Sequence, residues 1–355
     1  MNLRILVWLV IFVTVTAQMQ AQGRFWKWLK TENDTAYIED HTEDITARLY
    51  GSRKYTKFDI LDRKQKKDIL YRPNTPFNIG FGANYRFVGL NLGFNLPFIN
   101  RHNEKYGKTK YIDLQSHIYL RKIVVDFYGQ YYKGYYVANP EEVFGKAYAK
   151  LNPYPQRPDI RNIDFGLNAQ YIFNDKRFSY RAPNLQNEYQ KKSAGSFLVG
   201  GEMFLGRVKG DSSLVPSNMA DTSFLREEHY YKTGISSLAA NVGYAYTFVV
   251  HQHFFLSLSL TAGLGGNVTS LFLENGQVSR KVGLQFSNTV RASLGYNSSR
   301  YFAGVHYVGM NTRSGMPIPH TYQTFGTGNF RVSLVRRFEL KKPLWKTKTA
   351  GSNAG

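Results

Sequence analysis

The sequence of 355 residues contains no cysteine, so neither disulfide bonds nor thiolate metal ligands hold its fold together. Beyond residue 15 it has no stretch of 18 consecutive apolar residues, which excludes the usual pattern of a membrane-spanning helix. Acidic residues are scarce, since 25 Asp and Glu stand against 46 Lys and Arg. Tryptophan is also rare, with 4 residues, whereas the chain holds 26 tyrosines, 25 phenylalanines and 31 glycines. Its stability is therefore expected to come from backbone pairing rather than from covalent staples.

The dominant pattern is a two-residue alternation of apolar residues with polar or small ones. In residues 77–87, Phe, Ile, Ala and Tyr alternate with Asn, Gly and Arg, and residues 90–96, 238–250 and 254–264 repeat the pattern. Successive side chains of a strand point to opposite faces, so each run has one apolar and one polar face. The length of these runs, with aromatic residues near their ends, favours a transmembrane β-barrel with lipid outside and a polar lumen.

We predict an all-β, up-and-down antiparallel barrel of about twelve strands, within a range of about ten to fourteen. The barrel is expected to cover residues 45–340, with its first strand over 45–57 and a proline-rich loop over 138–160. The count depends on residues 178–235, of which 178–192 fit an extra strand, a lumen plug or an irregular segment. Short connections alternate with long ones, as in outer-membrane barrels. The short ones lie near residues 88, 121, 175, 252 and 298, and the long ones near 103, 148, 220, 272 and 318.

The N-terminal residues 1–21 have the pattern of a secretory signal peptide. Arg4 precedes an apolar core over residues 5–15, and small residues allow cleavage after Ala17 or Ala21. Residues 22–44 would then form a periplasmic N-terminal segment, and residues 341–355 a basic periplasmic tail. Export without a spanning helix predicts the outer membrane of a Gram-negative cell. It also argues against a nucleic-acid partner, although the pI of 9.8 would suit one.

Several charged residues fall on the polar faces of the predicted strands. A charge on the lipid face costs about 2–4 kcal/mol at the bilayer midplane, so these side chains are expected to face the lumen. Two interpretations remain open for them: a solute path with a selectivity zone, or a barrel plugged by its own polar network. The predicted lumen-lining residues are Arg86, Asp113, His117, Arg121, Asp126, Asp164, Glu202, Arg291 and Arg331.

Motifs for catalysis and metal binding are weak or missing. His251 and His253 could face the same way on a strand, but they lie at a predicted turn without a nearby acidic residue. The sequence contains neither the His-Glu-x-x-His nor the Gly-x-Ser-x-Gly pattern. Asp113 and His117 share a face while Ser116 points away, so these three do not form a triad on one strand. The sequence therefore predicts no metal, no cofactor and no enzymatic activity.

Four short segments resemble an uncharacterised family of outer-membrane barrels, known only as a domain of unknown function. They are residues 34–38, 177–182, 192–197 and 211–216, and the resemblance extends over about residues 34 to 340. It implies the barrel fold and the outer-membrane location, and it brings no catalytic or binding residues with it.

Three functions are compatible with the sequence. The first is a channel for small anionic solutes, which Arg86, Arg291 and Arg331 would attract. The second is a non-conducting structural or assembly barrel that docks a partner through its long loops or its basic tail. The third, a membrane hydrolase, has no motif in its favour. The expected partners are outer-membrane lipids and lipopolysaccharide, and the sequence does not fix the oligomeric state.

Overall fold

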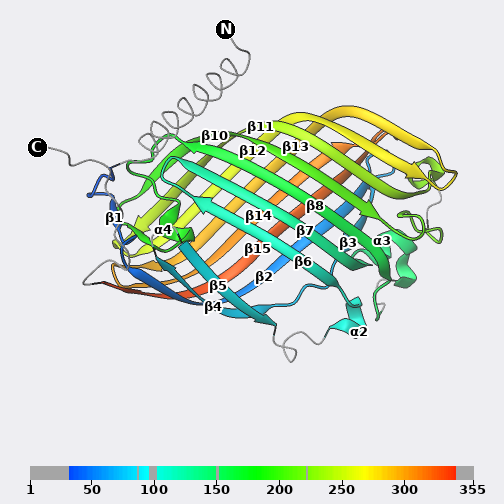
Figure 1. Ribbon diagram of the computed structural model, residues 1–355. Coiled ribbons are helices and arrows are strands. Elements are labelled where there is room, and N and C mark those ends of the chain that lie inside the picture. Colours follow the sequence, from blue (N-terminus) through cyan, green and yellow to red (C-terminus); the bar gives the residue numbers. More distant parts are fainter. Residues whose placement is uncertain (1–31, 86–87, 96–101, 149–151, 221–222, 341–355) are drawn as a thin grey trace, which may run out of the picture.

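The computed structural model describes residues 32–85, 88–95, 102–148, 152–220 and 223–340, and it is dominated by long antiparallel strands (Figure 1). The predicted signal peptide and basic tail lie outside these residues. Among the described residues, no helix is long and apolar enough to cross a membrane. The strands are β1 (Ile38–Asp40), β2 (Ile45–Asp62), β3 (Lys67–Arg72), β4 (Asn78–Tyr85), β5 (Val88–Asn95), β6 (Lys110–Tyr119), β7 (Ile123–Val137), β8 (Gln156–Ile172), β9 (Glu188–Gln190), β10 (Ala194–Lys209), β11 (Tyr230–Val250), β12 (Phe254–Leu273), β13 (Val278–Asn297), β14 (Tyr301–Gly315) and β15 (Thr321–Phe338). The helical turns are α2 (Asn103–Tyr106), α3 (Pro140–Phe144), η1 (Lys146–Tyr148), α4 (Arg181–Asn184) and η2 (Phe224–Glu227).

Ten strands close into a barrel. Going round the ring, the order is β2, β3, β7, β8, β10, β11, β12, β13, β14 and β15, and β15 pairs with β2 along its whole length. β1 and the end of β15 lie at one end of the barrel, which we call the proximal end, and β3 and α3 lie at the opposite, distal end (Figure 1). The closure between β3 and β7 rests on only two residue pairs, at Tyr71 and Arg72. The predicted all-β antiparallel barrel is confirmed.

The ring has ten strands, at the lower end of the predicted range, and not twelve, because three strands of the sheet stand outside the closed ring. β4 pairs with the proximal half of β2, β5 pairs with β4, and β6 pairs with β7. The distal half of β2 pairs instead with β3, a strand that the sequence analysis does not predict. β3 reaches β7 directly, so the ring closes without β4, β5 and β6.

Other element boundaries differ from those expected. β2 continues past the predicted end at residue 57 to Asp62, and it pairs with β15 over this whole length. β8 begins at Gln156 and therefore includes Pro158. Pro158 lies where the pairing with β7 is irregular, so the N–H that proline lacks is not needed for a hydrogen bond between the strands. The connection near residue 272 is short, since β12 and β13 extend to Leu273 and Val278.

The outer surface of the barrel is apolar. Leu114, Leu238 and Val282 are 63%, 67% and 81% exposed, and they belong to a band of outward leucines, valines and phenylalanines on nearly every strand. Soluble proteins rarely expose apolar patches of this size, whereas lipid covers such a band in a transmembrane barrel. The one amide on this face of β13, Asn288, accepts a hydrogen bond from Nδ2 of Asn311 on β14 at 3.0 Å.

Candidate functional site: the barrel interior

The inward faces of the strands carry the polar residues of the alternation, and the structure places seven of the nine predicted lumen residues there. These are Asp113, His117, Asp126, Asp164, Glu202, Arg291 and Arg331, and each is buried or partly buried. Arg121 lies in the turn between β6 and β7, where its guanidinium group contacts Glu188. Arg86 lies outside the described residues. The alternation does not identify the hydrogen-bond or ion-pair partner of each side chain, because the partners lie on distant strands.

An ion pair crosses the middle of the lumen. Arg291 of β13 donates to Asp126 of β7, and these strands stand five places apart in the ring of ten. Asp126 also contacts Nδ1 of His117 at 2.7 Å and accepts from Nδ2 of Asn168 at 3.2 Å. Asp126 is 0% exposed and Arg291 is 3% exposed, so both charges are removed from water. Opposite walls of the barrel therefore touch at this level.

A second polar bridge joins β6 and β7 to β15. The carboxylate of Asp113 accepts from Nε2 of Gln130 at 2.8 Å and from Nε2 of Gln115 at 3.1 Å. Both amide groups also donate to Oγ1 of Thr327 on β15, at 2.9 and 3.1 Å. Lys54 of β2 lies 3.7 Å from Asp113. These contacts tie β6 across the interior, although β6 is not part of the closed ring.

The distal end of the lumen is filled by apolar side chains. Phe204 of β10 and Phe325 of β15 come from opposite walls, and their ring centroids are 5.3 Å apart. Phe58 of β2 packs against Phe325 with the two rings tilted and their centroids 5.2 Å apart. Leu214 and Leu225, from the connection between β10 and β11, are fully buried in the same cluster. This distal cluster places buried apolar side chains across the lumen at that end.

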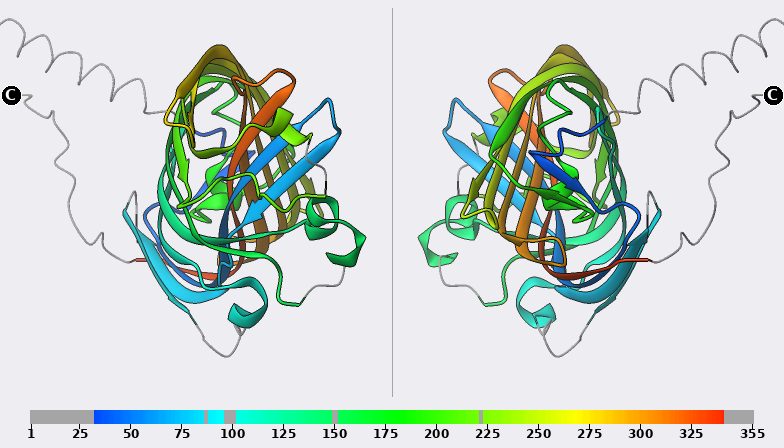
Figure 2. Two further views of the ribbon diagram at one scale, coloured as in Figure 1. Left: turned by 90° about the vertical axis from the view of Figure 1, so that its right-hand side faces the viewer. Right: turned by 90° about the vertical axis from the view of Figure 1, so that its left-hand side faces the viewer.

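The proximal end is closed by residues 178–190, which we call the plug. The plug contains α4 and β9, and β9 pairs with β1 inside the barrel. Seen along the barrel axis, α4 and β1 lie within the ring of strands (Figure 2). Phe178 and Tyr180 of the plug pack on inward residues of the wall, among them Tyr119 and Leu198. Of the three interpretations of residues 178–192, the plug is the one that the structure adopts.

Arginines of the wall hold the plug by its backbone carbonyl groups. Arg48 donates to the carbonyl oxygen of Leu185 at 2.9 Å, and Arg331 donates to that of Asn184 at 2.9 Å. Arg337 donates through Nε to the carbonyl oxygen of Gln186 at 2.7 Å and through Nη2 to that of Glu188 at 3.2 Å. These guanidinium groups bind chain oxygens of the protein itself.

The carboxylate of Glu188 anchors the plug through side chains. It accepts from Arg121 at 2.7 Å and from Arg181 at 3.2 Å. Burial raises the pKa of Glu188, and the two guanidinium groups oppose that shift. Sequence reasoning missed Arg48, Arg337 and Glu188. Arg48 and Arg337 occupy inward positions of β2 and β15, so the alternation could have identified them. Nothing in the sequence pattern identifies Glu188.

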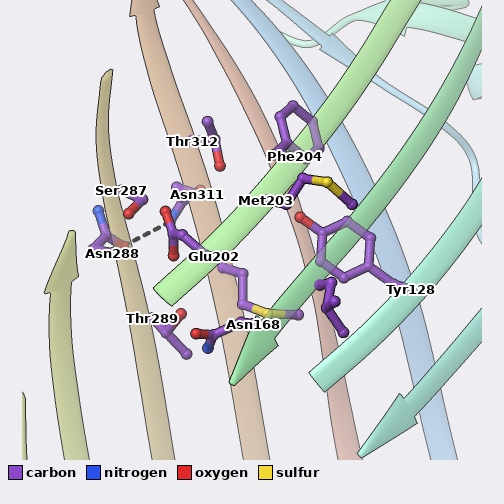
Figure 3. A pocket seen from close by; sticks show the side chains of 12 residues that line it. Tyr128, Asn168, Glu202, Met203, Phe204, Ser287, Asn288, Thr289, Asn311 and Thr312 are labelled. Atoms are coloured by element: carbon purple, nitrogen blue, oxygen red, sulfur yellow. Dashed lines mark hydrogen bonds between the residues drawn. The ribbon is translucent and has the colours of Figure 1, made fainter. Parts of the chain in front are cut away.

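A cavity of about 20 Å³, room for about one water molecule, lies beside Glu202 and Tyr128 (Figure 3). Glu202 accepts from Nε2 of Gln285 on β13 at 3.0 Å. Asp164 is buried beside Asn162 and has no cation within ion-pair distance among the described residues. No group of three or more His, Cys, Asp or Glu side chains gathers in a metal-binding arrangement within the described part of the chain. The pair His251 and His253 lies in the turn between β11 and β12, as the sequence indicates.

Comparison with known proteins identifies a family but no function. The model of a domain of unknown function, DUF4421, matches residues 32–338. No curated protein matches the chain. Among solved structures, the outer membrane protease OmpT from Escherichia coli is 9% identical, with a TM-score of 0.37, and the match covers 84% of this chain and 98% of that one.

Two further solved structures also match most of the chain at low identity. The translocator domain of the autotransporter NalP from Neisseria meningitidis is 9% identical with a TM-score of 0.31, over 92% of this chain and 97% of that one. The toluene transporter TodX from P. putida is 7% identical with a TM-score of 0.20, over 88% and 95%. None of these similarities bears on the function of this chain.

Proposed function

This chain belongs to the family of the domain of unknown function DUF4421, and we infer its function from the side chains that meet inside its barrel. We propose that it is an integral barrel of the Gram-negative outer membrane that conducts no solute and serves as a structural or docking component. The observation that carries this proposal is the contact between opposite walls, through Arg291 with Asp126 and through Phe204 with Phe325. The apolar outer band supports the membrane location.

Liposome swelling tests the absence of a solute path. Liposomes that contain the folded wild-type barrel should swell no faster than empty ones in arabinose or in gluconate, because side chains fill the lumen at both ends. A large porin reconstituted in the same lipid is the positive control. Swelling at a rate that increases with the amount of barrel would contradict the proposal.

A second function, an anion channel, is favoured by the arginines that hold the plug. If the plug left the lumen, the guanidinium groups of Arg48, Arg121, Arg331 and Arg337 would lose their partners and would line an anionic path. The distal cluster would have to move as well, so this candidate needs two rearrangements. Swelling in gluconate but not in arabinose would favour it over the non-conducting barrel.

The wall offers a surface on which another polypeptide can dock. Among the described residues, β5 pairs only with β4 and β6 pairs only with β7, so two strand edges face a gap in the proximal half of the wall (Figure 1). Asn91 and Leu92, on opposite faces of β5, are both exposed. Unpaired backbone groups are costly in lipid, and an extended segment of a partner protein would satisfy them by adding a strand.

A cysteine pair tests whether this gap closes by itself. Because the chain has no native cysteine, Leu92→Cys combined with Leu114→Cys reports directly on contact between β5 and β6. We expect no disulfide in the purified barrel, whereas the control pair Phe81→Cys with Leu92→Cys, at direct cross-strand positions, should oxidise readily. Equal oxidation of the two pairs would show that the edges meet without a partner.

A further inference from the structure

Five basic residues stand side by side at the distal end of the wall. Lys110 of β6 pairs with Lys133 of β7, and Lys133 pairs with Arg161 of β8. Arg161 pairs with Lys209 of β10, and Lys209 pairs with Lys232 of β11. Strands of a sheet lie about 4.8 Å apart, so this basic row extends for about 19 Å across the wall.

The basic row faces outward at the edge of the apolar band. Two residues further along their strands, on the same face, Lys110 is followed by Ile112 and Arg161 by Ile163, which are 62% and 49% exposed. On β10, Leu205 precedes Lys209 by four residues and is 42% exposed. Distal to the row come the polar connections between the strands. The row therefore lies at the height where lipid tails would give way to headgroups, in the leaflet farther from β1 and the end of β15.

The row has almost no negative charge to balance it. Among the described residues, the only carboxylate within ion-pair distance is that of Asp211, 3.4 Å from Arg161, and this pair is exposed. Lys232 lies over the ring of Phe272 at 3.7 Å and Lys209 over the ring of Tyr231 at 5.7 Å, contacts that keep both ammonium groups against the wall. Arg207 adds a further cation on the same face of β10.

Like charges at direct cross-strand positions repel, so five in succession weaken an isolated barrel. Hydrogen bonds and packing do not require this arrangement. A row of anionic groups at the same spacing and height would relieve the repulsion, and phosphate groups of lipids supply such charges at this height of the membrane.

We propose that the basic row is a binding site for the phosphate groups of a multiply phosphorylated lipid in the outer leaflet, of the kind that lipopolysaccharide provides. This inference rests on the proposed function only for the membrane location. Its test is carried out in detergent and does not depend on whether the barrel conducts.

The test is native mass spectrometry of the folded barrel in detergent with added lipid A that carries two phosphates. The test variant combines Lys133→Gln, Arg161→Gln and Lys209→Gln. The control variant removes three charges from the distal end of β13 and β14, by Arg280→Gln, Lys281→Gln and Arg313→Gln. We expect lipid A to dissociate from the test variant at a concentration at least ten times higher than from the wild type. The control variant should bind within two-fold of the wild type.

Two further readouts keep the result interpretable. Lipid A from which the phosphates have been removed should bind the wild type and the test variant equally, because only the charge contact is lost. The test variant should unfold at the same or a higher urea concentration than the wild type without lipid, since repulsion is relieved. Equal loss of lipid A from the test and control variants would overturn the proposal, as would equal binding of lipid A with and without its phosphates to the wild type.

Discussion

Replacing Arg337 with alanine is expected to lower the free energy of unfolding of the barrel by about 3 kcal/mol or more. Arg337 is 4% exposed and donates to the carbonyl oxygens of Gln186, Glu188 and Ser298 and to Oδ1 of Asn297. The substitution leaves these buried oxygens without their donor and opens a space between the plug and the wall. Urea unfolding in micelles, followed by far-ultraviolet circular dichroism, measures the loss.

The neighbouring residue provides a matched control for this change. Arg336 points outward, over the rings of Tyr301 and Phe338, and makes no hydrogen bond to the plug among the described residues. Arg336→Ala should change the free energy of unfolding by less than about 1 kcal/mol. Similar losses for the two variants would mean that Arg337 does not fasten the plug in the way described.

Replacing Asp126 with alanine is the second change with a large expected effect. It leaves the guanidinium group of Arg291 buried in the middle of the lumen without a counter-charge, and it removes the partner of His117. Breaking a buried ion pair from one side costs about 3–5 kcal/mol, so we expect a loss of that size in the same unfolding measurement.

A double variant separates the isolated charge from lost packing. Asp126→Leu combined with Arg291→Met replaces both charges with apolar groups of similar volume, and such replacements are often close to neutral. The double variant should therefore be more stable than Asp126→Ala alone. If the double variant were less stable than Asp126→Ala, the isolated charge of Arg291 would not be the main cause of the loss. The ion pair itself would then contribute net stability.

The alternation in the sequence was enough to predict the barrel and the direction of most side chains. Leu238, Val242 and Phe248 of β11 face outward because a strand has a period of two, and inward Asp126 and Arg291 follow from the same rule. Period alone does not say which strands become neighbours. β3, which has six residues with three charges, is therefore not evident from the sequence, although it joins β2 to β7 at the distal end.

The sequence does not predict which side chains meet in the lumen, because these residues lie far apart along the chain. Phe204 and Phe325 are separated by more than a hundred residues, and only the closed ring brings their rings together. The plug has no periodic pattern, because hydrogen bonds from Arg48, Arg331 and Arg337 to its backbone determine its path. Backbone carbonyl groups are the same in every residue, so the sequence does not record such contacts.

Single-channel recording of the refolded wild-type barrel in a planar bilayer, with a salt gradient across it, tests the central claim most directly. Because opposite walls meet through Arg291 with Asp126 and through Phe204 with Phe325, the barrel should insert without producing steady conductance. Circular dichroism and heat-modifiable migration of the same preparation establish that it is folded. Steady openings, with an ion preference that changes when Arg331 is replaced with glutamine, would contradict the closed lumen and establish an anion path.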